Sequence, residues 1–201
     1  MRPAGIVLII NNQLKAVSDL DHIKLNDLLR GNGHENLILN AKDLSNLREL
    51  IKVLEPFAEA TEIVQSDKTV TISCVMPIIL SLNRHLQSCL TVTVTLTAFV
   101  KCLLNSLRDR FASLFAQLGL NFPSNSTTSL PFSSNIFLMT PALDPAYAFN
   151  WLEDLPGSDE DKEALRFKIH GMYSASLSTS RQIISALKRI EFSKFVTYCI
   201  D

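Results

Sequence analysis

The side chains best suited to binding a metal ion are one histidine and one cysteine. His85 and Cys89 are four residues apart, a spacing that places two side chains on the same face of a helix. Imidazole nitrogen and thiolate sulfur are ligands that Zn²⁺ prefers. A second half-site is missing, because Cys74 and Cys102 lie 11 and 13 residues from this pair with no ligand beside them. We therefore interpret both side chains as structural, because a buried free cysteine behaves as a small apolar residue, and predict no metal and no cofactor.

A group of carboxylates is the second candidate for chemistry. Asp159, Glu160, Asp161 and Glu163 could hold a metal or act as acid and base, but they directly follow Ser158, a preferred residue at helix starts. Acids in a first turn stabilise the positive end of a helix. No GxSxG, HExxH, P-loop or GxGxxG motif is present. We predict a helix start here, no catalytic residue, and no small-molecule substrate.

Basic residues form two groups that are weak candidates for contact with nucleic acid. One contains Lys101, Arg108 and Arg110, and the other contains Lys188 and Arg189, with Lys194 nearby. Such groups usually form a solvated helix face, and less often contact phosphates. The chain has 19 Lys and Arg against 20 Asp and Glu, a net charge of −1, so no overall field attracts nucleic acid or an anionic membrane.

The strongest structural signal is an apolar helical stripe between residues 40 and 65. Asn40 is suited to cap this helix, with Asp43 placed to answer the cap. Pro56 predicts either a kink or a helix end with a second helix beginning at once. A stripe this regular is expected to be buried against other helices. Its members recur at three- and four-residue steps: Leu44, Leu47, Leu50, Ile51, Leu54, Phe57 and Ala58.

The rest of the chain also predicts helices, with a few ambiguous segments. Residues 1–10 indicate a short buried strand or a frayed helix start, and their apolar run is too short to cross a membrane. Residues 91–96 alternate like a strand, and residues from about 97 to 118 carry an unbroken helical stripe. Asp144 and Pro145 predict the start of a short helix toward Trp151.

These elements predict an all-α fold organised as one helical domain. We expect an atypical or truncated N-terminal segment at 1–10, a helical bundle at 11–118, a mobile loop at 119–134, and further helices of the same domain at 135–201. The four cysteines are widely spread and contain no CxxC pair, which is typical of reduced thiols in an intracellular protein.

Three segments of the sequence form a recognisable order. They are Asn12–Lys15, the run from Leu50 to Thr61 continued by Asp67-Lys68, Thr71, Ser73 and Pro77, and the stretch Pro141–Pro145. Together they resemble the hAT superfamily of DNA transposases and their domesticated relatives, the BED zinc-finger proteins. The resemblance covers about residues 12–152, and the second segment is its specific part. It implies a helical insertion that interrupts an RNase H-like catalytic domain, here without most of the sheet.

The resemblance also shapes the expected function. The BED-type finger, the catalytic acids and the C-terminal dimerisation segment of these transposases have no counterpart in the sequence, so no catalytic residue is carried over. We expect a non-enzymatic, transposase-derived fragment with at most a DNA-associated or scaffolding role, in the nucleus rather than the cytoplasm. The alternative is a helical protein–protein interaction module without any nucleic-acid role. Partners would be DNA, another protein or a second copy, and no membrane.

Overall fold

The structure is a computed structural model and describes residues 4–65, 72–120, 122, 132–153 and 155–177. Within these residues the chain forms eight α-helices and two short 3-10 helices, and no strand. The predicted all-α fold class is therefore confirmed. In the same part of the chain, no helix is long and apolar enough to span a bilayer.

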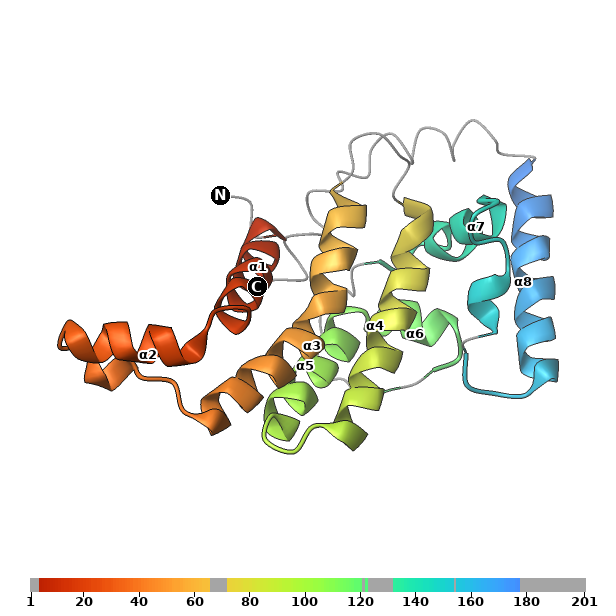
Figure 1. Cartoon of the computed structure of the whole chain (residues 1–201). Coiled ribbons are helices and arrows are strands. Elements are labelled where there is room, and N and C mark those ends of the chain that lie inside the picture. Colours follow the sequence, from red (N-terminus) through yellow and green to blue (C-terminus); the bar gives the residue numbers. More distant parts are fainter. Residues whose placement is uncertain (1–3, 66–71, 121, 123–131, 154, 178–201) are drawn as a thin grey trace.

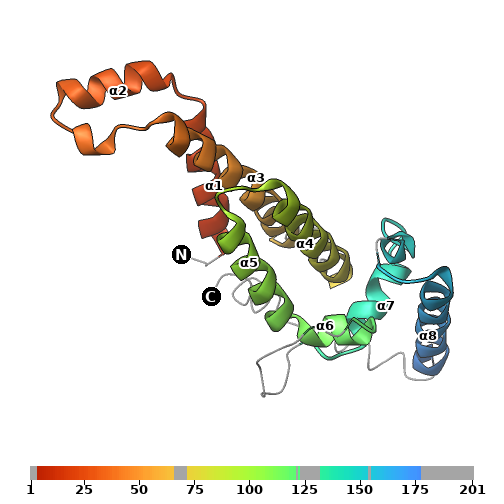
Figure 2. The same ribbon diagram turned by 90° about the horizontal axis from the view of Figure 1, so that it is seen from below.

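The helices follow one another in a layered bundle with an arm at one end (Figures 1 and 2). Helix α4 contacts α3, α5 and α7, while α1 packs on α3 and α8 packs on α7. Helix α2 and the 3-10 helix η1 project from the body, and α8 lies at the opposite end (Figure 2). The elements are α1 (Ala4–Ser18), α2 (His22–Gly31), η1 (Glu35–Leu37), α3 (Ala41–Val64), α4 (Ile72–Val92), α5 (Thr97–Arg110), α6 (Ala112–Gln117), α7 (Ile136–Leu143), η2 (Asn150–Leu152) and α8 (Asp159–Leu177).

Helix α4, rather than α3, lies at the centre of the core. Ten residues of α4 are buried, against three of α3, namely Val53, Ala58 and Val64. The prediction that the apolar stripe of residues 40–65 would be buried is therefore wrong for most of its members. Leu44, Leu47, Leu50, Ile51, Leu54 and Phe57 are only partly buried. The reason is position: α3 lies between α1 and α4, and these two neighbours leave part of its stripe uncovered.

The predicted helix caps are confirmed at α3 and α8. The Asn40 side chain accepts hydrogen bonds from the backbone N–H groups of Lys42 and Asp43, and Asp43 accepts one from the Asn40 N–H, which completes a capping box. Ser158 and Asp161 form the same reciprocal arrangement at the start of α8. Pro56 lies inside one continuous helix, and α3 bends along its length (Figure 1). Of the two alternatives for Pro56, the kink is correct.

The helix expected from residue 97 to 118 starts where it was predicted, but it is interrupted rather than continuous. Helix α5 begins at Thr97, as predicted, but ends at Arg110, and α6 begins at Ala112. Phe111 between them adopts φ −110° and ψ 24°, and its side chain is fully buried with its ring 5.2 Å from that of Phe132. The break turns the chain so that Phe111 enters the core while α6 changes direction.

Both ambiguous segments belong to helices and their connections rather than to strands. The apolar run of residues 5–10 lies in α1, so the strand alternative is wrong. Thr91 and Val92 finish α4, and residues 93–96 form the turn into α5. Threonine hydroxyls account for the turn: Thr93 Oγ1 donates to the Cys89 carbonyl at 2.8 Å, and Thr95 Oγ1 donates to Glu49 Oε2 at 2.9 Å. Threonine at these positions therefore serves hydrogen bonding, not a sheet.

The segment around Asp144 differs from its prediction. Asp144 ends α7 instead of starting a helix, and residues 145–149 form turns before η2. Its carboxylate still caps the following backbone, because Oδ1 accepts a hydrogen bond from the Ala146 N–H at 2.9 Å. Residues 121 and 123–131 of the expected mobile loop, and residues 178–201 of the expected C-terminal helices, lie outside the described residues.

Candidate functional site

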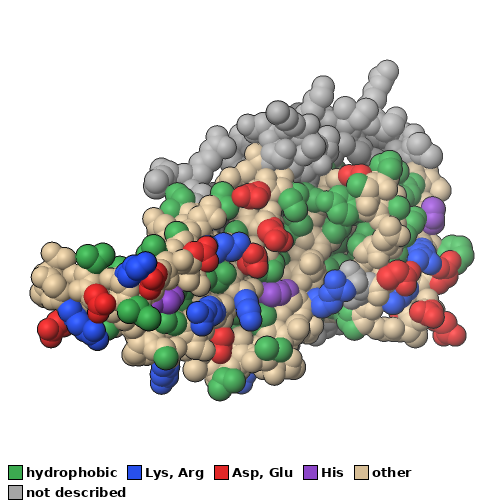
Figure 3. Space-filling model, viewed as in Figure 1, with side chains coloured by type: hydrophobic (Ala, Val, Ile, Leu, Met, Phe, Trp, Pro, Cys, Tyr) green, Lys and Arg blue, Asp and Glu red, His purple; other side chains and the backbone are tan. Residues whose placement is uncertain are grey.

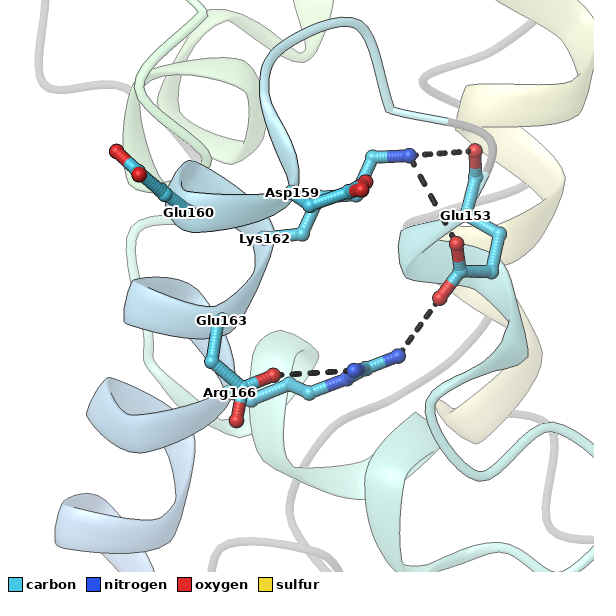
Figure 4. A pocket seen from close by; sticks show the side chains of 6 residues that line it. All are labelled: Glu153, Asp159, Glu160, Lys162, Glu163 and Arg166. Carbon is cyan, nitrogen blue, oxygen red and sulfur yellow. Dashed lines mark hydrogen bonds and ion pairs between the residues drawn. The ribbon is translucent and has the colours of Figure 1, made fainter.

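The described part of the chain contains a charged cavity between η2 and α8 (Figure 4). Its volume is about 470 Å³, and it is open to solvent. Glu153 follows η2 and faces α8 across the cavity, while Glu160 points away from the other lining side chains (Figure 4). The lining residues are Glu153, Asp159, Glu160, Lys162, Glu163 and Arg166.

Ion pairs join four of the six residues that line this cavity. Arg166 binds Glu153 Oε1 at 2.7 Å and Glu163 Oε2 at 3.1 Å. Lys162 Nζ donates to the Glu153 carbonyl oxygen at 3.1 Å and lies 3.8 Å from its Oε2. The two carboxylate oxygens of Glu153 therefore each face a cation of the chain itself. These contacts link Glu153, the residue after η2, to Lys162 and Arg166 of α8.

Sequence reasoning found the acids of this cluster but missed its cations. Their spacing could have revealed the cations, since Lys162 and Arg166 are four residues apart and therefore share one face of α8. The partner Glu153 could not be found from the sequence, because it lies on the other side of a turn that contains Gly157 at φ +136°. Only the folded turn brings Glu153 opposite α8.

The His85 and Cys89 side chains do meet on one face of α4, as their spacing predicts. Cys89 Sγ lies 3.4 Å from His85 Nε2, and both residues are partly buried. Burial raises the pKa of the Cys89 thiol. Cys74 is buried at the other end of the same helix, where burial raises its pKa to about 11. No group of three or more potential metal ligands occurs among the residues that the structure describes.

The described basic candidates, Lys101, Arg108 and Arg110, all lie on α5 and differ in exposure. Lys101 is exposed on α5. Arg108 is partly buried, where its Nε donates to Asn83 Oδ1 at 3.0 Å and its guanidinium lies 4.0 Å above the Phe122 ring. Arg110 is also partly buried, with Nε 3.2 Å from Ser106 Oγ. Lys188 and Arg189 lie outside the described residues. On the face shown in Figure 3, Lys and Arg side chains are interspersed with Asp and Glu.

A polar junction joins the start of α4 to the end of α7. Ser73 is buried and its hydroxyl donates to Asp144 Oδ2 at 2.6 Å, while Thr140 Oγ1 lies 3.4 Å from the Ile72 carbonyl oxygen. The bond from Ser73, helped by that from the Ala146 N–H, holds the pKa of Asp144 below its ordinary value. A negative charge is favourable here because it faces the first turn of α4.

Comparison with known proteins gives no relative from which a role could be transferred. No family model, no curated protein and no solved structure matches this chain. Function must therefore be argued from the chain's own residues and contacts.

Proposed function

We propose that this chain is a non-catalytic helical scaffold derived from a hAT-type transposase, and that it acts by associating with a second copy of itself. The derivation rests on the three segments that resemble this superfamily. The scaffolding role rests on the surface of the molecule, above all on the α2–η1 arm, defined as residues 19–39.

Contacts between the resembling segments support the derivation. Lys15, in the first segment, forms an ion pair with Glu55, in the second, at 2.6 Å. Ser73, in the continuation of the second segment, binds Asp144, in the third, at 2.6 Å. These two contacts tie α1 to α3 and α4 to α7.

The roles of the acids support a non-catalytic reading. Two-metal phosphoryl transfer requires several carboxylates that converge on one point. Asp43 and Asp161 instead cap helices, Asp144 binds Ser73, and Glu153 pairs with Lys162 and Arg166. Each of these carboxylates is explained by a structural contact.

The surface of the α2–η1 arm carries the proposal of association. No residue of α2 or η1 is buried. Ile23 and Leu28 are 76% and 64% exposed, and Leu20 and Leu37 are also exposed. The arm thus exposes four large apolar side chains on an element that projects from the body, and a partner that covered the arm would bury them.

A second copy of this chain fits this arm because its charges are balanced. Lys24 pairs with Asp21 and Arg30 pairs with Asp27, so the arm presents both signs. The net charge of −1 gives little repulsion between copies. An interface between identical surfaces requires that each copy offer what the other binds. The arm offers positive, negative and apolar side chains.

DNA contact is the less favoured role because Arg108 is committed to Asn83 and Phe122, which leaves Lys101 as the exposed candidate among those described. The two roles are separable by experiment. In duplex-binding assays, phosphate contacts would weaken steeply as salt rises and would depend on Lys101. A steep salt dependence whose slope falls by about one in Lys101→Ala would replace scaffolding with DNA association as the role of this chain.

Sedimentation velocity over a range of concentrations tests self-association directly. The double variant I23S/L28S removes two exposed apolar side chains, each worth about 1.5–3 kcal/mol when fully buried, so it should weaken the dimer by at least roughly tenfold. Phe167→Ser on α8, where Phe167 is 69% exposed, is the matched control and should leave association unchanged. A monomer at all concentrations, or equal weakening by both variants, contradicts the proposal.

A further inference from the structure

The His85–Cys89 pair has a geometry that the proposed scaffold does not use. The two residues lie one turn apart on α4, near its C-terminal end, and Cys89 Sγ lies 3.4 Å from His85 Nε2. Their neighbours Arg84, Gln87 and Ser88 are exposed, so this part of the helix is reached from solvent. Both side chains are held in place by partial burial, which reduces the entropy lost when they bind a ligand.

The separation of the sulfur and nitrogen atoms matches a chelate. A zinc ion binds sulfur at about 2.3 Å and imidazole nitrogen at about 2.0–2.1 Å in tetrahedral geometry, which sets the two ligand atoms about 3.5 Å apart. The observed 3.4 Å is close to this separation. We propose that His85 Nε2 and Cys89 Sγ form a two-ligand site for one soft metal ion of the zinc class.

Binding exchanges one proton for the metal. The Cys89 thiol loses its proton to solvent, its sulfur lone pair forms a bond to the ion, and the neutral imidazole contributes its Nε2 lone pair. Water would supply the ligands that the protein does not. A site with two protein ligands holds its metal exchangeably, unlike closed four-ligand sites that hold a fold together.

The other described cysteines lack this arrangement. Cys74 is buried and only 3% exposed, so its sulfur is closed off from solvent. Cys102 is exposed on α5, and no histidine lies three or four residues from it in the sequence. Cys102 therefore offers a matched control: an accessible thiol without the imidazole one turn away.

Titration of the reduced full chain with Co²⁺ tests the site, because cobalt replaces zinc and a thiolate–cobalt bond gives a charge-transfer band. The wild type and Cys102→Ser should both bind one equivalent with that band, and excess Zn²⁺ should abolish it. Cys89→Ser should lose the band. His85→Gln should weaken binding by at least roughly tenfold. Far-UV circular dichroism checks that each variant keeps its helices.

Alkylation gives an independent measurement. Zn²⁺ should slow the reaction of Cys89 with iodoacetamide in the wild type and slow it much less in His85→Gln, because the chelate then loses one ligand. Three results overturn the proposal: no band at millimolar Co²⁺, a band that persists in Cys89→Ser, or equal affinities for the wild type and His85→Gln.

Discussion

At the scale of single residues, the Ser73–Asp144 hydrogen bond joins segments that are 71 residues apart. Its strength comes from a charged acceptor that lies at the first turn of α4. The Asp144 carboxylate is ionised more easily in the folded chain than in the unfolded chain, because two hydrogen-bond donors favour its charged form. The folded state is therefore stabilised at neutral pH by a group that loses this effect in acid.

We predict that Asp144→Asn lowers the free energy of unfolding at pH 7. The gap in unfolding free energy between this variant and the wild type should shrink as pH falls through about 4 and below. The sign follows from the lowered folded pKa, because the stabilisation exists above the unfolded pKa and disappears once the folded carboxyl is protonated. Urea midpoints of both proteins at a series of pH values measure this. Asp19→Asn is the control, since Asp19 is exposed, and should change little. A difference that is constant with pH would show that Asp144 acts without its charge.

At the scale of helices, the sequence predicts the features that depend only on residues close together in the chain. Asn40 with Asp43 and Ser158 with Asp161 identify helix starts because each pair caps within three residues. The sequence also predicts the start of α5 at Thr97. It does not predict the central position of α4 or the separation of α5 from α6, because periodicity shows which face of a helix is apolar but not how many neighbours cover that face.

Phe111 shows why one apolar residue ends a helix that its neighbours would continue. Its side chain is 0% exposed and packs against Phe132, so the core rather than helix propensity determines its backbone conformation. We predict that Phe111→Ala costs about 3–5 kcal/mol in the free energy of unfolding. Phe167→Ala on α8, 69% exposed, should cost less than about 0.5 kcal/mol. If chemical denaturation shows that the two variants lose the same free energy of unfolding, Phe111 does not anchor the α5–α6 break.

At the scale of the whole molecule, stability is distributed unevenly between the body and the α2–η1 arm. The body buries one continuous apolar cluster built around α4, whereas no residue of α2 or η1 is buried. The arm is closed by two hydrogen bonds between Asn26 and Leu39, in which Asn26 Nδ2 donates to the Leu39 carbonyl at 2.9 Å and Asn26 Oδ1 accepts from the Leu39 N–H at 3.1 Å. A helix held mainly by such contacts opens without unfolding the rest.

We predict that backbone amides of α2 exchange with deuterium at least roughly a hundredfold faster than those of α4 when the protein is dilute and monomeric. Asn26→Ala should accelerate exchange in α2 alone, because it removes both bonds to Leu39, and Asn105→Ala on α5 should leave α2 unchanged. Raising the protein concentration should slow exchange in α2 if the arm is the surface that binds a second copy. Exchange in α2 as slow as in α4 in dilute solution would mean that the arm is stabilised by the body and is not a separate unit that a partner can order.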